Sequence, residues 1–187
     1  MSTTATPLLP GNFYHVYNRG NNGETLFYSS ENYKHFLKLL AKYSMDSIEY
    51  YAYCLMKNHF HLLIRICDRP QKQPHRILAT VFNAYAQAIN RQESRKGSLF
   101  LKPFRRKLLQ DESYRAQVVY YIHANPVHHG VVKDFRIYPY SSYKSILSDA
   151  PTKLKRTDVL AWFGGREGFI EYHSRTSVEI ASELCLE

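Results

Sequence analysis

The chain has 187 residues, of which 44% are hydrophobic and 14% aromatic, with 25 Lys and Arg residues against 16 Asp and Glu residues. This composition excludes a disordered chain, and the length fits one domain better than two. The formal charge of +9 favours a polyanionic partner, either nucleic acid or an anionic membrane surface. No apolar run is long enough to span a bilayer, and residues 1–11 lack the pattern of a signal peptide. We therefore expect a cytoplasmic protein.

The first part of the chain predicts the order strand, helix, strand, strand. Residues 13–19 (FYHVYNR) are rich in β-formers and precede the turn-forming cluster of residues 20–23. Apolar residues at helical spacing predict a helix over residues 31–44, and two apolar runs at 49–55 and 59–66 predict a pair of antiparallel strands. The second run alternates, so two sets of side chains point to opposite faces: Phe60, Leu62, Ile64 and Ile66 on one, and His59, His61, Leu63 and Arg65 on the other.

The second part predicts a helix, a strand and a further helix. An apolar stripe places the first helix at about residues 75–92. The stretch 91–107 follows with seven basic residues and one acid, and a strand occupies part of residues 104–110. Asp111 caps the next helix, which we expect to end at Asn125-Pro126 because the residue before proline avoids the α region. Its predicted apolar face carries Tyr114, Val118, Tyr121 and Ile122.

This order of elements predicts an α+β fold with a ferredoxin-like (RRM-like) antiparallel sheet. Two helices would cover one face of the sheet, and the helix that carries Tyr121 would lie on the other. We expect an N-terminal tail at residues 1–11, a main domain at 12–148 and a C-terminal helical appendage at 149–187. The appendage is predicted to form two short helices around residues 162–165 (WFGG).

Two pairs of residues could carry chemistry. His59 and His61 lie at i and i+2 on a strand, so their imidazoles project side by side and could share one cation. Tyr121 and Asn125 are four residues apart on one helical face, which would place a phenol beside an amide oxygen. Each pair also has a purely structural interpretation: a solvated polar strand for the histidines, and a core tyrosine with a helix stop for Tyr121 and Asn125.

Longer strings around these residues resemble a known family. Residues 53–64 (YCLMKNHFHLLI) are similar to the histidine-hydrophobe-histidine (HUH) segment of single-tyrosine transposases of the insertion-sequence-200 type. Residues 121–127 (YIHANPV) and 138–143 (YPYSSY) resemble the tyrosine helix and its sequel in the REP-associated branch of that family. Residues 14–20 (YHVYNRG) and 97–100 (GSLF) match the same branch, so the resemblance covers roughly residues 12–148.

The resemblance implies a metal-dependent endonuclease and strand transferase that acts on single-stranded DNA at hairpin-forming sequences. Tyr121 would be the nucleophile, forming a 5′-phosphotyrosine, and His59, His61 and Asn125 would be the metal ligands. Because a neutral amide is a weaker ligand than a carboxylate, the expected cation is Mg²⁺ or Mn²⁺, although two imidazoles would also accept zinc. Lys and Arg side chains would contact DNA phosphates. The candidate DNA-binding residues are Asn18, Arg19, Arg95, Lys96, Lys102, Arg105, Arg106 and Lys107.

Two other functions fit parts of the same sequence. A ferredoxin-like sheet with exposed aromatics and a basic rim can bind single-stranded nucleic acid without cutting it. A metallohydrolase could bind zinc through His59, His61 and a third residue such as His123, His128 or His129. Related enzymes include dimers that exchange the tyrosine helix, so a homodimer and a monomer are both compatible with the sequence.

Overall fold

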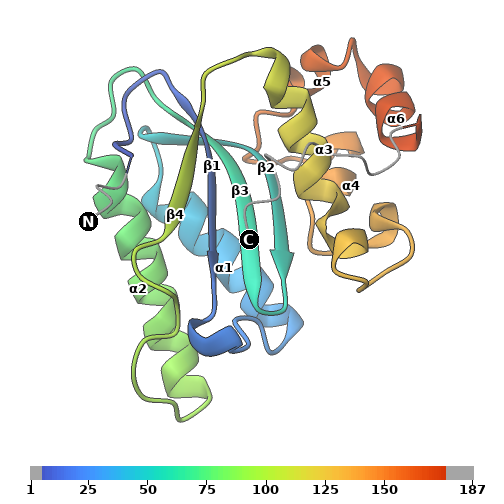
Figure 1. The fold of residues 1–187 in the computed structure, drawn as a ribbon. Helices are drawn as coiled ribbons and strands as arrows, with labels where there is room; N and C mark the ends of the chain where they lie inside the picture. Colours follow the sequence, from blue (N-terminus) through green and yellow to red (C-terminus); the bar gives the residue numbers. More distant parts are fainter. Residues whose placement is uncertain (1–5, 176–187) are drawn as a thin grey trace.

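The computed structural model describes residues 6–175 and places four antiparallel strands in one sheet (Figure 1). The strand order is β2-β3-β1-β4, which is the ferredoxin-like order that the sequence predicts. The bounds of the strands are β1 (Phe13–Arg19), β2 (Ile48–Met56), β3 (His59–Ile66) and β4 (Arg105–Leu109). The α+β fold is therefore confirmed, with both central strands, β1 and β3, paired on each side.

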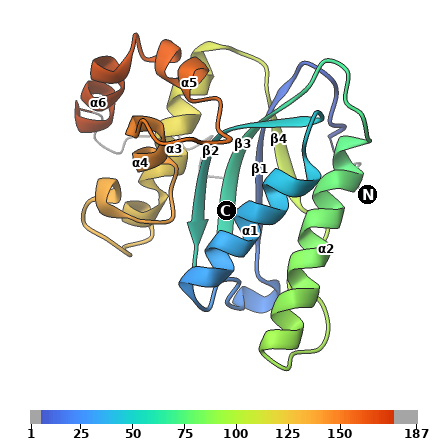
Figure 2. The ribbon, with the colours of Figure 1, turned by 180° about the vertical axis from the view of Figure 1, so that it is seen from behind.

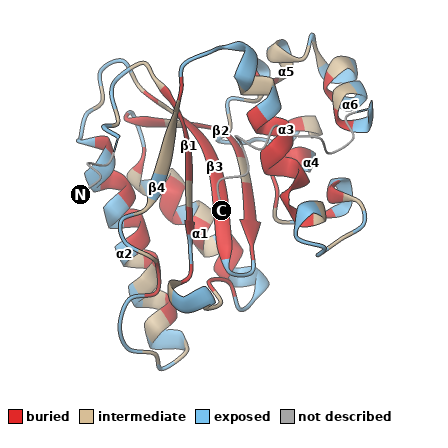
Figure 3. Cartoon of the chain, viewed as in Figure 1, coloured by how far each residue is buried: buried red, intermediate tan, exposed pale blue. Residues whose placement is uncertain are grey.

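Helices α1 (Ser30–Tyr43) and α2 (Pro74–Gln92) cover one face of this sheet (Figure 2). Strand alternation explains this layer, because Phe60, Leu62, Ile64 and Ile66 of β3 all lie in the core against these helices. Figure 3 shows the resulting band of buried residues through the sheet. The predicted helices over 31–44 and 75–92 are confirmed to within a residue.

Helix α3 (Ser113–His128) lies on the opposite face, over β2 and β3 (Figure 1). The helix does not end at Asn125, as predicted, but continues through Pro126 for a further two residues. Its last turn persists because it is buried: Asn125 and Pro126 are both in the core, and backbone carbonyls there accept later N–H groups. Tyr114 is another difference, since it is exposed although it falls on the predicted apolar face.

The C-terminal part of the described chain packs against α3 rather than standing apart. Beyond the short helix α4 (Tyr143–Leu147), α5 (Arg156–Trp162) and α6 (Arg166–Arg175) are the two helices predicted around residues 162–165. Val159 and Phe169 of these helices are fully buried in the same apolar cluster as α3. Two 3-10 turns, Asn21–Gly23 and Phe135–Ile137, complete the regular structure. None of the helices among residues 6–175 is both long and apolar enough to cross a bilayer.

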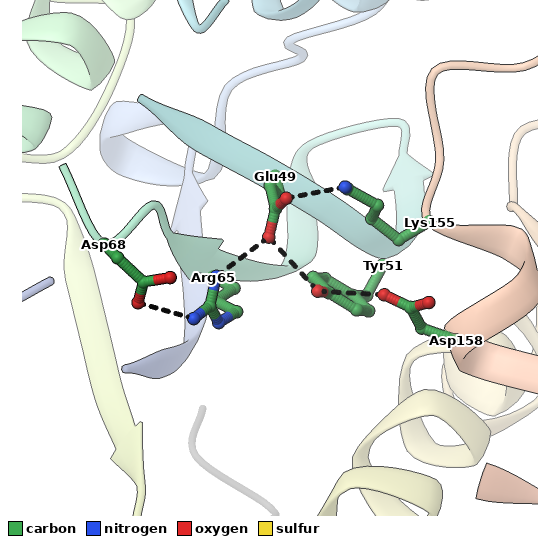
Figure 4. A network of polar contacts seen from close by, with 6 residues as sticks. All are labelled: Glu49, Tyr51, Arg65, Asp68, Lys155 and Asp158. Atoms are coloured by element: carbon green, nitrogen blue, oxygen red, sulfur yellow. Dashed lines mark hydrogen bonds and ion pairs between the residues drawn. The ribbon is translucent and has the colours of Figure 1, made fainter. Parts of the chain in front are cut away.

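A polar network joins the start of α5 to the edge of the sheet (Figure 4). Glu49 of β2 pairs with Lys155 at 2.6 Å and with Arg65 of β3 at 3.3 Å. The Tyr51 hydroxyl donates to Glu49 at 3.2 Å and contacts Asp158 of α5 at 3.4 Å. The Lys155 ammonium and the Arg65 guanidinium keep the pKa of Glu49 below its usual value despite its partial burial. The network therefore ties the C-terminal segment to β2 and β3.

Candidate functional site

Both predicted metal-ligand histidines lie on the sheet face that carries α3. They share this face with Leu63 and Arg65, as the alternation of β3 predicts. Both histidines are buried. The strand register sets His61 opposite Tyr17 of β1, and Tyr17 opposite Arg105 of β4. A basic, an aromatic and an imidazole side chain thus follow one another across three strands on the same face.

Each of these histidines has a neighbour that orients its ring. The Nδ1 atom of His61 lies 2.9 Å from Nε2 of His15, a buried residue of β1 whose ring stacks on that of His61. The Nδ1 atom of His59 lies 2.9 Å from the amide oxygen of Asn58. An amide oxygen only accepts hydrogen bonds, so His59 carries its proton on Nδ1 and the lone pair on Nε2.

Helix α3 brings Tyr121 over the same part of the sheet. Its ring centroid lies 5.7 Å from that of His61 and 5.8 Å from that of His15, edge-on to both. The side chain is 4% exposed, so the sequence correctly places it on a buried stripe. The ring of His128, two turns later on α3, lies 5.9 Å away.

Asn125 is buried one helical turn beyond Tyr121. Its side-chain amide nitrogen donates to the backbone carbonyl of Tyr121 at 2.9 Å. This bond fixes the side-chain torsion of Asn125 and assigns its nitrogen as the donor. The amide oxygen is therefore the atom with which Asn125 could bind a cation. Helix α3 contacts β2 and β3, and both members of the predicted pair on it, Tyr121 and Asn125, are buried.

The predicted metal ligands are two imidazoles and one neutral carboxamide, from His59, His61 and Asn125. The ring centroids of His59 and His61 are 5.4 Å apart, as expected for neighbours at i and i+2. Within residues 6–175 no group of three or more His, Cys, Asp or Glu side chains could hold a metal ion. Of the three candidate third ligands for zinc, His129 has its ring centroid 4.5 Å from that of His59, His128 lies beside Tyr121, and His123 contacts His173 in a different cluster. Further ligands would be neutral oxygens, water or a phosphate.

A pocket of about 280 Å³ opens beside the two histidines. Its walls include three of the predicted DNA-binding residues, Asn18, Arg19 and Arg105. Asn18 is buried, and its side chain donates to the backbone carbonyl of Leu101, another residue of the pocket wall. Arg19 and Arg105 are exposed and charged. The remaining lining residues are Tyr17, Asn58, His59, Phe60, His61, Leu101, Pro103 and His129.

The other predicted basic residues differ in what they contact. Lys96 and Lys102 are exposed, and Lys107 lies opposite His15 in the β1–β4 register. Arg95 forms an ion pair with Glu24 and donates to Asn90, so it holds the loop after α2. The guanidinium of Arg106 lies over the Phe104 ring at 4.8 Å and donates to the backbone of Thr6. These two arginines are thus engaged within the protein.

Several residues of this region carried no functional signal in the sequence. A larger groove of about 710 Å³ shares Asn18, Leu101 and Pro103 with the histidine pocket and runs along α2. Two exposed amides, Asn83 and Gln87, line it one helical turn apart. Polar residues at i and i+4 on an amphipathic helix are normally solvated surface, so only the tertiary structure shows that they face a groove. His15 was missed for a similar reason, because only strand pairing brings it to His61.

The fold and these residues define a class of protein: a ferredoxin-like sheet that presents a histidine pair to a helix bearing a buried tyrosine. No family model matches the chain. A curated Haemophilus influenzae protein described as a REP-associated tyrosine transposase is 31% identical over 100 residues, which are 49% of this chain and 57% of that protein. The chain therefore spans little more than half the length of this relative.

A solved structure supports the same resemblance at the level of the fold. It is described as a REP-associated tyrosine transposase bound to a REP hairpin. The two folds match with a TM-score of 0.67 at 16% identity, over 82% of this chain and 90% of the other. The resemblance to REP-associated tyrosine transposases is thus confirmed, in sequence by one relative and in fold by the other.

Proposed function

We propose that this protein is a transposase-like enzyme that cleaves and rejoins single-stranded DNA at hairpin-forming sequences, with Tyr121 as its nucleophile. The observation that carries the proposal is the approach of the Tyr121 ring to His61 and His15 within one buried cluster. A tyrosine ring that served the core alone would pack against apolar side chains, because burial of imidazoles beside it costs free energy. The resemblance to transposases, one of which was solved with a hairpin, supports the same function.

The geometry supports a site formed within one chain. Tyr121 and His61 belong to the same molecule, on α3 and β3, and their rings lie 5.7 Å apart. A dimer that exchanged the tyrosine helix would instead bring Tyr121 of one chain to the histidines of another. We therefore propose that a homodimer, if one forms, is not needed to complete the site.

His59, His61 and Asn125 would hold a divalent cation, Mg²⁺ or Mn²⁺. When bound, such an ion stabilises negative charge on the phosphate oxygens and orients the scissile bond. His59 would offer Nε2, because Nδ1 carries the proton that it donates to Asn58. His61 would also offer Nε2, with its Nδ1 proton directed at His15.

In the cleavage step the Tyr121 oxygen attacks phosphorus. The bond between Tyr121 Oη and phosphorus forms, the bond from phosphorus to the 3′-oxygen breaks, the phenol loses a proton and the leaving oxygen gains one. The product is a 5′-phosphotyrosine and a free 3′-hydroxyl, and attack by another 3′-hydroxyl reverses the step without ATP. A free phenol titrates near pH 10, so the proton must leave during the attack.

We propose that DNA reaches this site along the exposed basic residues next to the pocket. Arg19 and Arg105 line the pocket and would contact phosphates on either side of the scissile bond. The exposed Lys96 and Lys102 and the half-buried Lys107 extend positive charge over the neighbouring loop and β4. Asn83 and Gln87 in the adjoining groove would meet unpaired bases, since carboxamides can hydrogen-bond base edges.

The experiment is a denaturing gel of the protein after incubation with labelled single-stranded hairpin DNA and Mn²⁺. The wild type should retain label in a covalent adduct, Tyr121→Phe should retain none, and Tyr120→Phe should behave as the wild type. Tyr120 is a matched control because it is the adjacent tyrosine, about 100° around the helix, and its ring packs against Phe135, Tyr172 and His173 instead. Burial also raises the pKa of the Tyr120 phenol.

Two outcomes would contradict the proposal. If Tyr120→Phe lost the adduct and Tyr121→Phe kept it, the assignment of the nucleophile would be reversed. If the wild type bound the hairpin with Mn²⁺ and never became labelled, the chain would be a binding module.

A further inference from the structure

A second histidine pair lies behind the tyrosine helix, away from the pocket. His123 of α3 and His173 of α6 are 50 residues apart in sequence, and their ring nitrogens lie 3.0 Å apart. Both are buried: His123 is completely inaccessible and His173 is 3% exposed. The proposed chemistry at Tyr121 does not use either ring, so their burial calls for a separate explanation.

The hydrogen bonds around this pair allow one arrangement of protons. The Phe169 carbonyl can only accept, so Nδ1 of His173 donates to it at 2.8 Å and Nε2 of the neutral ring accepts. His123 must then donate from Nδ1 to His173, which leaves its own Nε2 as the acceptor for the Ser142 hydroxyl at 2.7 Å. The Ser142 oxygen accepts in turn from the Tyr53 backbone N–H at 2.9 Å.

This chain of hydrogen bonds connects four parts of the fold. It begins on α6, crosses α3 at His123, reaches the residue just before α4 and ends on β2. Aromatic rings surround His173 and separate these hydrogen bonds from the solvent. Those rings belong to Tyr120, Phe135, Tyr143, Phe163, Phe169 and Tyr172.

His123 lies on α3 between Tyr121 and Asn125, and its side chain projects to the other side of the helix. It follows Tyr121 by two residues and precedes Asn125 by two, so it projects about 200° around the helix from each of them. Tyr121 contacts the histidines of the sheet, while His123 contacts Ser142 and α6. Hydrogen bonds on that side of α3 can therefore restrain both the rotation of the helix about its axis and its position along that axis.

Apolar packing alone would not fix the helix in this way. Aromatic contacts tolerate small shifts, whereas a buried donor or acceptor whose partner moves out of reach is left unsatisfied, which costs free energy. His123 makes two of these hydrogen bonds, one to His173 and one to Ser142. A slide or rotation of α3 would therefore break both. Buried polar contacts that set the register of a helix act by this principle.

We propose that His123 and His173 are positioning residues, which hold α3 so that Tyr121 lies over His61 with Asn125 one helical turn beyond it. In this proposal the C-terminal helices are not an independent appendage, because His173 of α6 helps to position the site on α3. This inference rests on the proposed function only in taking Tyr121 and Asn125 as the residues to be positioned. His173 touches neither DNA nor a reacting atom in this scheme and acts through His123.

The test compares substitutions that keep or remove the acceptor at position 173. In His173→Gln the amide oxygen can replace Nε2 and accept from His123, whereas His173→Phe fills the space without an acceptor. The matched control is Val159→Ala, which creates a cavity in the same apolar cluster without touching the hydrogen bonds. For each protein we would measure the Tm, the NMR signals of the Tyr121 ring and the Asn125 side-chain amide, hairpin DNA affinity, and the rate of adduct formation.

We expect His173→Phe to shift the Tyr121 and Asn125 signals and to slow adduct formation roughly tenfold or more, with hairpin affinity unchanged. His173→Gln should restore both signals and rate. Val159→Ala should lower the Tm by a similar amount and leave the signals in place. In the wild type, the imidazole ¹⁵N shifts of both histidines should report rings protonated on Nδ1 only.

Equal NMR shifts and equal slowing in Val159→Ala and His173→Phe at matched Tm would overturn the proposal, because His173 would then contribute stability alone. If His173→Phe does not fold, Ser142→Ala, which removes one oxygen at the other end of the chain, takes its place with the same expectation. If the wild type forms no adduct, the proposed function fails, and the NMR signals of Tyr121 and Asn125 still decide the positioning role.

Discussion

The histidines on the two sides of α3 form clusters that differ in what surrounds them. His59 and His61 lie beside a pocket with the exposed arginines Arg19 and Arg105 in its wall. His123 and His173 are enclosed by aromatic rings, and every ring nitrogen of this pair has a hydrogen-bond partner within the protein. The same residue type therefore serves two purposes. A pocket and nearby charge suit an imidazole to bind a ligand, and a complete set of internal partners suits it to hold a structure.

Substitution of the sheet histidines should have the largest effect. We expect His61→Ala to lower Mn²⁺ affinity by more than about 100-fold, since loss of a ligand should exceed the loss of an outer contact. Adduct formation should fall with it. The measurements are Mn²⁺ binding by electron paramagnetic resonance and the denaturing gel. His75→Ala, at an exposed histidine of α2, is the control and should match the wild type. Unchanged Mn²⁺ binding in His61→Ala would remove that residue from the ligand set.

The buried cluster should respond to pH through stability. Burial lowers the pKa of His173 to about 4, although its bond to the Phe169 carbonyl opposes the shift. In the unfolded chain the ring titrates near its usual value of about 6.5. The unfolded state therefore binds more protons between these two values, and the free energy of unfolding should fall as the pH drops from about 6.5 to about 4. The loss attributable to this ring is on the order of 3 kcal/mol.

Urea unfolding at pH 7 and pH 4.5 measures this loss. His173→Gln should show a smaller fall in the free energy of unfolding than the wild type, because Gln does not titrate. His75→Gln controls for the removal of an exposed histidine and should keep the wild-type pH dependence. An identical fall in His173→Gln and the wild type would mean that His173 does not titrate in this window.

Local patterns predict the strands and the sheet faces of this fold because both follow from side-chain alternation over a few residues. The positions of His59, His61 and Tyr121 follow from the same patterns. The end of α3 was predicted wrongly, because burial of the last turn outweighs the local preference of the residue before Pro126. Propensity describes the isolated segment, and here the packing decides.

Contacts between distant residues could not be predicted from one sequence. His15 and His61 are 46 residues apart and meet only through the β1–β3 register. His173 reaches His123 only after α6 packs on α3. Arg95 illustrates the same limit, since the sequence does not show that this member of the basic stretch forms an ion pair with Glu24. A run of charges predicts a basic surface, but partners elsewhere in the chain decide which members face it.

His15 lies between the two kinds of histidine and should give the smallest of these effects. It is buried like His123, yet its Nε2 contacts a proposed metal ligand at 2.9 Å. A partner that accepts the Nδ1 proton of a ligating histidine fixes the ring and raises its basicity. We therefore expect His15→Leu to lower Mn²⁺ affinity by about tenfold. His15→Gln, whose amide oxygen can accept that proton, should lose less, and calorimetric titration with Mn²⁺ distinguishes the two. Equal affinities in His15→Leu and the wild type would show that His15 only packs against His61, as a member of the core rather than of the site.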